Sequence, residues 1–275
     1  MAHHLEDFLN RLALEPAVLV TVGRTRGSVP REEGTWMAVF AKHQVGTIGG
    51  GQLEWSALQQ ARQRLAGGDP QPWEHAAALG PSLGQCCGGS LVLHCEPVDM
   101  ADASALRARL APRLTPVALF GGGHVGRALV QALAPLPFAV QWVDSRDEVF
   151  PSDVSAQVHT EHSDPVQAAV ADLAPGAHVL IMSFSHAEDL DIVAACLRRR
   201  RERADLRFIG LIGSRTKWAS FRRRLAERGF TESELALVTC PIGLPGIEDK
   251  APEVIAASVV AQLLLLREAA DSPPA

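Results

Sequence analysis

Two adjacent cysteines, Cys86 and Cys87, stand between glycines in the stretch LGQCCGGS, and the chain has five cysteines in all. Normal disulfide geometry disfavours a bridge between neighbouring residues, because one peptide link holds their Cα atoms too close together. The CxxC spacing of a zinc site or of a thioredoxin-like pair is also missing. The sequence therefore predicts two free thiols on a glycine-flanked stretch of backbone, with a purely structural pair as the alternative.

Arginines that could bind an anion lie upstream, in the segment RTRGSVPREEG. Arg24, Arg26 and Arg31 can each make bidentate contacts to a phosphate or a carboxylate. A second segment, GTIGGGQLE, could line an anion site with backbone amides where it turns into a helix. Its three consecutive glycines are Gly49, Gly50 and Gly51. Solvated loop charges and a tight turn are the alternative, but both segments share one small domain with the cysteine stretch, which favours a site.

A glycine pattern typical of dinucleotide-binding folds occurs in the second half. Gly121, Gly123 and Gly126 fit G-x-G-x-x-G directly after a buried strand pattern and at the start of a helix pattern. Asp144 ends the next strand pattern, where an acid would meet a ribose hydroxyl. The sequence thus predicts a Rossmann-type site for a nucleotide or dinucleotide, with phosphate held at the helix N-terminus. Alternatively, the glycines serve only the turn and the packing of the helix.

The remaining chemically active side chains are interpreted as structural. His186, Glu188 and Asp189 follow a strand pattern, but one histidine and two acids are too few for a metal site, so helix capping and solvation are expected. Core packing is predicted for the other three cysteines, Cys95, Cys196 and Cys240.

Helix and strand periodicities place these residues in two domains. In the first, helices are expected over residues 5–14 and 53–66, and strands over 17–25, 35–40, 45–48, 73–79 and 90–97. In the second, strands over 116–120, 138–144, 178–183 and 207–213 alternate with helices, and a final helix begins at Pro252. The connector RLAPRLTP marks the boundary, which gives domains of residues 1–112 and 113–275. The predicted fold class is α/β, with an N-terminal mixed α+β domain followed by a Rossmann-like doubly wound parallel sheet.

Composition excludes several classes of protein. With 275 residues, 47% hydrophobic content and a net charge of −5, the chain is globular and is not expected to bind nucleic acid. The basic run Arg198–Arg203 is interpreted as the solvated end of a helix. No apolar stretch reaches membrane-spanning length, and the first ten residues lack an export signal. An odd number of cysteines without framework spacing indicates a reducing compartment, so a cytoplasmic protein is predicted.

Six segments, taken together and in this order, resemble the XdhC/CoxI family: RTRGSVPREEG, GTIGGGQLEW, LGQCCGG, VALFGGGHVGRAL, FIGLIGSRTK and CPIGLPGIEDKAPEVIAASVVAQLL. They span nearly the whole chain. The resemblance implies an N-terminal XdhC/CoxI-type domain and a C-terminal Rossmann-like domain. It also implies a chaperone without turnover of its own, which binds the molybdenum cofactor, protects it during sulfuration by a cysteine desulfurase, and delivers it to the molybdenum subunit of xanthine dehydrogenase.

The resemblance gives the candidate residues roles and implies a homodimer. A thiolate of Cys86 or Cys87 would be a soft ligand for molybdenum, and the arginines and amide nests would suit the phosphate of the pterin. Two positions depart from the family pattern: Gln52 stands where histidine is frequent, and Ser183–His186 reads SFSH in place of THSH. The second departure puts in doubt any role that needs two histidines. The alternative function is an NAD(P)-dependent oxidoreductase using the Rossmann domain, and a third is a regulatory nucleotide sensor.

Overall fold

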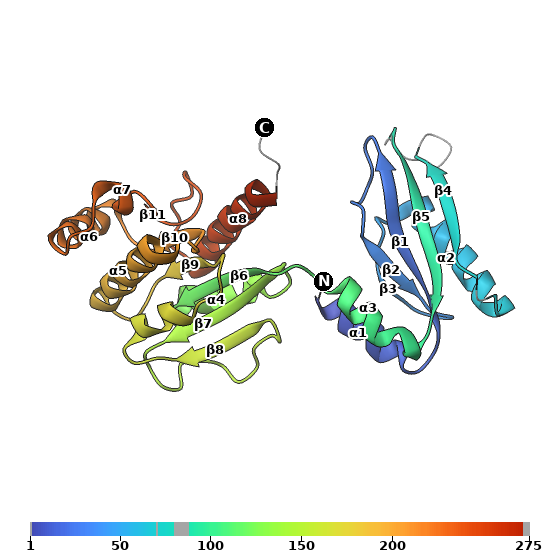
Figure 1. The fold of residues 1–275 in the computed structure, drawn as a ribbon, viewed down its shortest axis with the longest axis horizontal. Coiled ribbons are helices and arrows are strands. Elements are labelled where there is room, and N and C mark those ends of the chain that lie inside the picture. Colours follow the sequence, from blue (N-terminus) through green and yellow to red (C-terminus); the bar gives the residue numbers. More distant parts are fainter. Residues whose placement is uncertain (1, 70, 80–87, 272–275) are drawn as a thin grey trace. The chain divides into compact units, whose positions relative to one another are not determined.

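The computed structural model describes residues 2–69, 71–79 and 88–271, and it divides into two compact units, Met1–Pro112 and Arg113–Ala275. Each unit is built around its own sheet (Figure 1).

The first unit holds a five-stranded antiparallel sheet in the order β3-β2-β1-β5-β4. Its strands are β1 (Ala17–Arg26), β2 (Trp36–Val39), β3 (Gln44–Gly46), β4 (Trp73–Ala78) and β5 (Ser90–Val98). Its helices are α1 (Ala2–Leu12), α2 (Gly51–Gly67) and α3 (Ala103–Leu110), with the 3-10 turn η2 (Met100–Asp102) before α3.

The two faces of this sheet are covered differently. Helix α2 buries Leu53, Ala57 and Ala61 against one face. Helices α1 and α3 cover the other face at one end only, where Phe8 and Leu106 join the core. The alternation in β5 gives the same division, since Leu91, Leu93 and Cys95 lie on the α2 side while Ser90 and His94 are exposed. Among the described residues, no helix covers the other end of that face, which is called the open face below.

The second unit holds a six-stranded parallel sheet in the order β11-β10-β9-β6-β7-β8. Its strands are β6 (Thr115–Phe120), β7 (Phe138–Asp144), β8 (Val158–His162), β9 (His178–Ile181), β10 (Phe208–Leu211) and β11 (Val238–Thr239). When β6 is taken as the first strand, the order is the one found in doubly wound dinucleotide-binding folds. The direction of the strand order reverses between β6 and β9. The predicted fold class is confirmed.

Helices cover both faces of the parallel sheet. Helices α4 (His124–Leu133) and α8 (Pro252–Asp271) pack on one face, with Leu129 and Leu263 fully buried. The other face carries η3 (Val166–Asp172), α5 (His186–Arg203) and α6 (Arg215–Glu227), while α7 (Glu232–Leu235) follows α6. Within the described ranges, no helix combines the length and the apolar character needed to cross a membrane.

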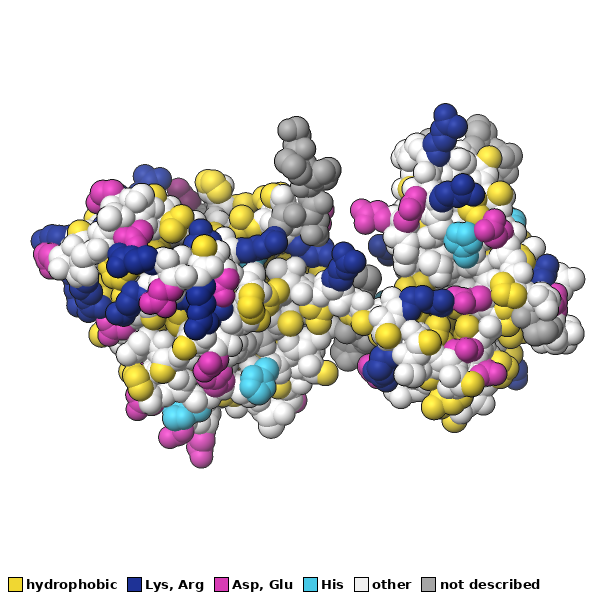
Figure 2. All heavy atoms as spheres, viewed as in Figure 1, with side chains coloured by type: hydrophobic (Ala, Val, Ile, Leu, Met, Phe, Trp, Pro, Cys, Tyr) yellow, Lys and Arg dark blue, Asp and Glu magenta, His cyan; other side chains and the backbone are white. Residues whose placement is uncertain are grey.

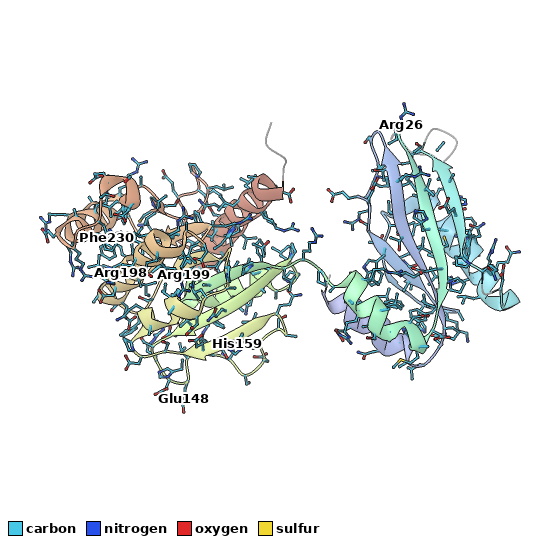
Figure 3. The ribbon with its side chains drawn as sticks, in the orientation of Figure 1. Arg26, Glu148, His159, Arg198, Arg199 and Phe230 are labelled. Atoms are coloured by element: carbon cyan, nitrogen blue, oxygen red, sulfur yellow. The ribbon has the colours of Figure 1, made fainter. Side chains whose placement is uncertain are left out.

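The basic run at the end of α5 is only partly solvated, which corrects one prediction. Arg199 is 6% exposed, and its guanidinium donates to the Asp205 carboxylate and to the carbonyls of Val170 and Leu173. Arg198 next to it is exposed (Figure 3). Figure 2 shows other Lys and Arg side chains spread over the surface formed by α5 and α6. One arginine of the run thus anchors η3 to α5 from within the core.

Candidate functional site

A β-bulge at the end of β1 positions the predicted anion-binding arginines. The β1–β5 register pairs Val22 with Leu93 and Thr25 with Leu91, so two residues of β1 lie opposite one residue of β5. Because side chains alternate along a strand, the extra residue turns Thr25 towards the α2 face and Arg26 towards the open face. Arg26 therefore lies at the end of the strand on the open side of the sheet (Figure 3).

The open face is hollowed beside these arginines. A pocket of about 540 Å³ is lined by the ends of three neighbouring strands, β1, β5 and β4. Its lining residues are Arg24, Thr25, Arg26, Ala76, Ala77, Ala78, Ser90, Leu91 and Val92. Small side chains form the floor of the hollow, while the cations come from β1. A pocket of this size and composition can accept a ring system that carries an anionic group.

The guanidinium groups of Arg24, Arg26 and Arg31 make no hydrogen bond or ion pair with any other residue that the structure describes. One acid of their segment is engaged with the backbone, because Oε1 of Glu33 accepts from the backbone N–H of Thr25 at 2.7 Å and from its hydroxyl. The positive charge at this end of the sheet is therefore available to a ligand.

The predicted thiol pair, Cys86 and Cys87, lies outside the described residues. The backbone just after it packs against the arginine segment: a Cβ added to Gly89 would lie 2.3 Å from the carbonyl oxygen of Ser28 and 2.7 Å from that of Arg26. The backbone N–H of Leu79 donates to the carbonyl of Gly89 at 2.8 Å, which fixes the two ends of the connection between β4 and β5. The described residues Leu79 and Gly89, on either side of the thiol pair in the sequence, thus lie beside the hollow.

The glycine turn Gly49–Gly51 is an amide nest, but its anion is the chain's own Glu54. Oε2 of Glu54 accepts from the backbone N–H groups of Ile48 at 2.9 Å and Gly50 at 3.1 Å, and from the Thr47 hydroxyl. Burial opposes ionisation of this carboxyl, but these hydrogen bonds outweigh it and lower its pKa. The amides of Ile48 and Gly50 are therefore already satisfied, and binding of a ligand phosphate at this turn stays a prediction.

In the second unit the glycine fingerprint has the geometry that the sequence predicts. A Cβ on Gly126 would lie 2.0 Å from the carbonyl oxygen of Gly121, so α4 packs directly on the turn. A Cβ on Gly121 would lie 2.0 Å from the carbonyl oxygen of Met182, in the connection that follows β9. Gly123 is the N-cap residue of α4, and nothing described lies within 4 Å of the position of a Cβ there. The turn is tight on two sides and open above Gly123.

Asp144, which is predicted to meet a ribose hydroxyl, is also held by hydrogen bonds from the protein itself. Its side chain is 1% exposed, and Oδ2 accepts from the backbone N–H of Gly122 at 2.6 Å and from Nη2 of Arg146 at 2.9 Å. Oδ1 accepts from the backbone N–H and Nε of Arg146. Burial opposes ionisation of Asp144, yet the Arg146 guanidinium and the two backbone N–H groups outweigh it and lower the pKa. Arg146 was missed because it belongs to no sequence motif.

A second polar cluster at the carboxyl edge of the sheet was also missed. Nζ of Lys217 donates to Oδ2 of Asp189 at 2.6 Å and to the carbonyl of Ile212 at 2.9 Å. Oδ1 of Asp189 accepts from the backbone N–H and the hydroxyl of Ser183, both at 2.8 Å. The prediction that Asp189 caps a helix or is solvated is therefore wrong. Asp189 is the centre of a buried network.

The three described cysteines suit packing better than metal binding. Burial raises the pKa of Cys95 and of Cys196 to about 12 and that of Cys240 to about 11, which keeps all three thiols protonated at neutral pH. Cys95 and Cys196 are buried, and Cys240 is half-buried. Among described residues, no group of three or more His, Cys, Asp or Glu side chains could hold a metal ion.

Comparisons with known proteins agree with this two-part architecture. The model of the XdhC Rossmann domain matches residues 117–263, and that of the XdhC and CoxI family matches residues 11–75. The uncharacterized protein YqeB of Escherichia coli (strain K12) is 28% identical over 257 residues, which are 92% of this chain and 44% of YqeB. A crystal structure from Bacillus halodurans, described as a xanthine dehydrogenase, is similar in fold, with a TM-score of 0.79, 22% identity and 98% of each chain covered. Both matched regions fall in the two units described above, and the chain belongs to the XdhC and CoxI family.

Proposed function

We propose that this protein is an accessory factor for the maturation of xanthine dehydrogenase, which binds the molybdenum cofactor as cargo and hands it over without turnover. The observation that carries the proposal is the hollow on the open face of the first sheet, lined by Arg24 and Arg26. Membership of the XdhC and CoxI family and the fold shared with the Bacillus halodurans protein support the accessory role.

The residues around the hollow fit the chemistry of such a cargo. The molybdenum cofactor is a pyranopterin, which carries both its phosphate and its dithiolene-bound metal on the pyran ring. Unpartnered guanidinium groups of Arg24 and Arg26 suit the phosphate. The small side chains of Ala76 and Ala78 leave room for a ring over the sheet. A thiolate from Cys86 or Cys87 would be a soft further ligand for molybdenum, and the residues Leu79 and Gly89 that flank the pair in sequence lie beside the hollow.

Hand-over requires partners that bind and leave. We propose a cysteine desulfurase, which sulfurates the bound cofactor, and the molybdenum subunit of xanthine dehydrogenase, which receives it. Because a carrier has to release its cargo, both contacts are expected to be small and transient, so neither partner should copurify in stoichiometric amount. A homodimer is proposed on the family resemblance, and sedimentation of the pure protein tests it.

The test is the cofactor content of protein purified from cells that make the cofactor. The unmodified protein is expected to carry oxidisable pterin, measured by its fluorescence, and molybdenum. An Arg24→Ala/Arg26→Ala variant should lose most of both while keeping its fold, because neither side chain has a described partner. Arg223→Ala, which removes an exposed charge from the second unit, is the matched control. Equal cofactor content in all three proteins would contradict the proposed site.

The NAD(P)-dependent oxidoreductase stays the alternative function. General acid–base catalysis often assists hydride transfer, and at the carboxyl edge of the parallel sheet Lys217, Asp189 and Asp144 are each engaged in internal bonds. Turnover of any substrate with added NAD(H) or NADP(H) would favour that alternative over a carrier.

A further inference from the structure

Next to the hollow, the open face of the first sheet carries a further pair of polar side chains. Strands β1, β5 and β4 lie side by side (Figure 1), and every second residue of each strand lies on this face. The pairs that β5 and β4 place there are Ser90 with Ala78, Val92 with Ala76, and His94 with Glu74. The first two pairs line the hollow. The pair of His94 and Glu74 follows directly, towards the end of the face that α1 and α3 cover.

The carboxylate of Glu74 is open to a ligand. Oε1 of Glu74 lies 3.1 Å from Nδ1 of His94, and the Glu74 side chain is 62% exposed. His94 is its one hydrogen-bond or ion-pair partner among the residues that the structure describes. A carboxylate can accept about four hydrogen bonds, so the contact with His94 leaves both oxygens able to accept from a ligand. Glu96, the next acid of β5 on this face, is instead engaged in an ion pair with Arg109 of α3.

A glycine in β1 makes room for the imidazole that holds Glu74. A Cβ on Gly23 would lie 2.2 Å from Nε2 and 2.4 Å from Cδ2 of His94. Glycine within a strand often marks a place where another group approaches the backbone closely. The His94 ring therefore lies over the backbone of β1 in a position that no larger residue at Gly23 would allow, and from there it contacts Glu74.

The open face thus has cations at one end and a carboxylate further along. Arg26 pairs with Ser90 of β5, whereas Glu74 pairs with His94, four residues along the same strand. At about 3.3 Å per residue, the two positions are roughly 13 Å apart. Between them lie Ala76 and Val92 of the hollow. This arrangement suits a flat molecule with an anion at one end and hydrogen-bond donors at the other.

We propose that Glu74 recognises the aminopyrimidinone edge of the pterin ring, and that His94 positions the Glu74 carboxylate. This inference rests on the proposed cargo function. The edge presents a ring N–H and an amino group side by side, and two such donors match the two oxygens of a carboxylate. Glu74 is therefore the residue that selects the ring, whereas Arg24 and Arg26 select the phosphate.

The proposal also fixes the orientation of the cofactor. Its phosphate and its metal both lie on the pyran ring, at the opposite end of the fused rings from the aminopyrimidinone edge. With the phosphate at Arg24 and Arg26, the metal lies at the end of the sheet where Leu79 and Gly89 flank the thiol pair in sequence. One orientation of the cofactor therefore suits the arginines, the thiols and Glu74 together.

Binding of two phosphorylated ring compounds to the full chain, followed by their fluorescence, tests the proposal. Hydroxymethylpterin phosphate has the aminopyrimidinone edge, and hydroxymethyllumazine phosphate has a carbonyl oxygen in place of the amino group. Both carry the phosphate, so the comparison isolates the edge of the ring. We expect the pterin compound to bind about tenfold more tightly, because the extra carbonyl of the lumazine would face the Glu74 carboxylate.

Two substitutions test the roles of the individual residues. Glu74→Gln should weaken binding of the pterin phosphate about tenfold and strengthen binding of the lumazine phosphate, since an amide can donate to the added carbonyl. Gly23→Ala should lower the preference for the pterin without changing the affinity for the lumazine, because the added methyl group displaces His94 from Glu74. Glu227→Gln, at an exposed glutamate of the second unit, is the matched control. Circular dichroism checks that each variant is folded.

Several outcomes would overturn the proposal. They are equal binding of the two compounds by the unmodified protein, a preference for the pterin that survives Glu74→Gln, and absence of pterin binding at millimolar concentration. GMP carries the same edge on a purine, so tighter binding of GMP than of the pterin phosphate would assign the site to a purine nucleotide instead.

The cofactor content of purified protein separates this proposal from the cargo function on which it rests. Protein that carries the cofactor but does not distinguish the two compounds would keep the cargo function and overturn the role of Glu74. Protein that distinguishes them through Glu74 but carries no cofactor would keep the pterin site and contradict the cargo function.

Discussion

Lys217 and Asp189 form an ion pair of 2.6 Å at the carboxyl edge of the parallel sheet, with side chains only 12% and 3% exposed. The pair joins the first turn of α6 to the first turn of α5, and through Ser183 and Ile212 it also fixes the connections that follow β9 and β10. The pair therefore stabilises the carboxyl edge of the parallel sheet.

We expect Lys217→Met to lower the free energy of unfolding by about 3–5 kcal/mol, because it leaves the Asp189 carboxylate buried without its counter-charge. Urea unfolding followed by circular dichroism measures this loss.

Removing the uncompensated charge should recover much of that stability. The double variant Lys217→Met/Asp189→Asn is expected to unfold at a higher urea concentration than Lys217→Met alone, since an amide keeps an acceptor for Ser183 without a buried charge. Arg223→Ala serves as the surface control and should change stability by less than about 0.5 kcal/mol. A Lys217→Met variant as stable as this control would show that the pair contributes little.

Most of the fold follows from periodicity, and the elements that were missed have weak patterns. Strand β8 is an edge strand of the sequence VHTEH, in which only Val158 is buried, so no alternation of apolar residues marks it. Strand β11 has two residues. In contrast, β1 and β6 are long apolar runs whose burial leaves little choice of structure.

The sequence predicts which residue types form the candidate site, but it does not predict their orientation or their partners. The sequence indicates that Arg24 and Arg26 could bind an anion, but the bulge that turns Arg26 to the open face depends on pairing with β5, which is distant in sequence. Similarly, Glu54 fills the nest at Gly50 because α2 brings its carboxylate back over the turn. Partners fixed by tertiary structure cannot be found from local spacing.

The Asp144 carboxylate should make stability depend on pH. Its folded-state pKa is lowered, so its contribution is present above the unfolded pKa of about 3.9 and is lost as pH falls through the folded value. At pH 7, Asp144→Asn is expected to cost about 1–3 kcal/mol, because charged hydrogen bonds from Gly122 and Arg146 are weakened. Urea unfolding of both proteins at pH 7 and pH 3 should show the difference shrinking at the lower pH. A difference that stays constant between the two pH values would contradict this origin.

The close approach at Gly89 offers a test with a neighbouring control. A Cβ at Gly89 would lie 2.3 Å from the Ser28 carbonyl oxygen, so Gly89→Ala has to push the arginine segment away from the end of β5. We expect a loss of about 1–3 kcal/mol in stability and a lower content of bound pterin. Gly88→Ala changes the adjacent residue, where nothing described lies within 4 Å, and should leave both quantities unchanged. Equal effects of the two substitutions would show that the packing of Gly89 does not matter.

The cysteines differ in their expected roles: Cys86 and Cys87 are candidate metal ligands, whereas Cys95 is a core residue. Cys95 is 3% exposed and its pKa is raised to about 12 by burial, so at neutral pH it is a protonated core residue. Cys95→Ala should therefore cost roughly 1 kcal/mol of stability and leave the cofactor content unchanged. Cys86→Ala or Cys87→Ala should do the reverse, keeping the unfolding curve and stripping the protein of cofactor, since a soft thiolate is lost from the metal. Pterin fluorescence and molybdenum content of the single and double variants measure the outcome. Full occupancy in the double variant would return the pair to a structural role.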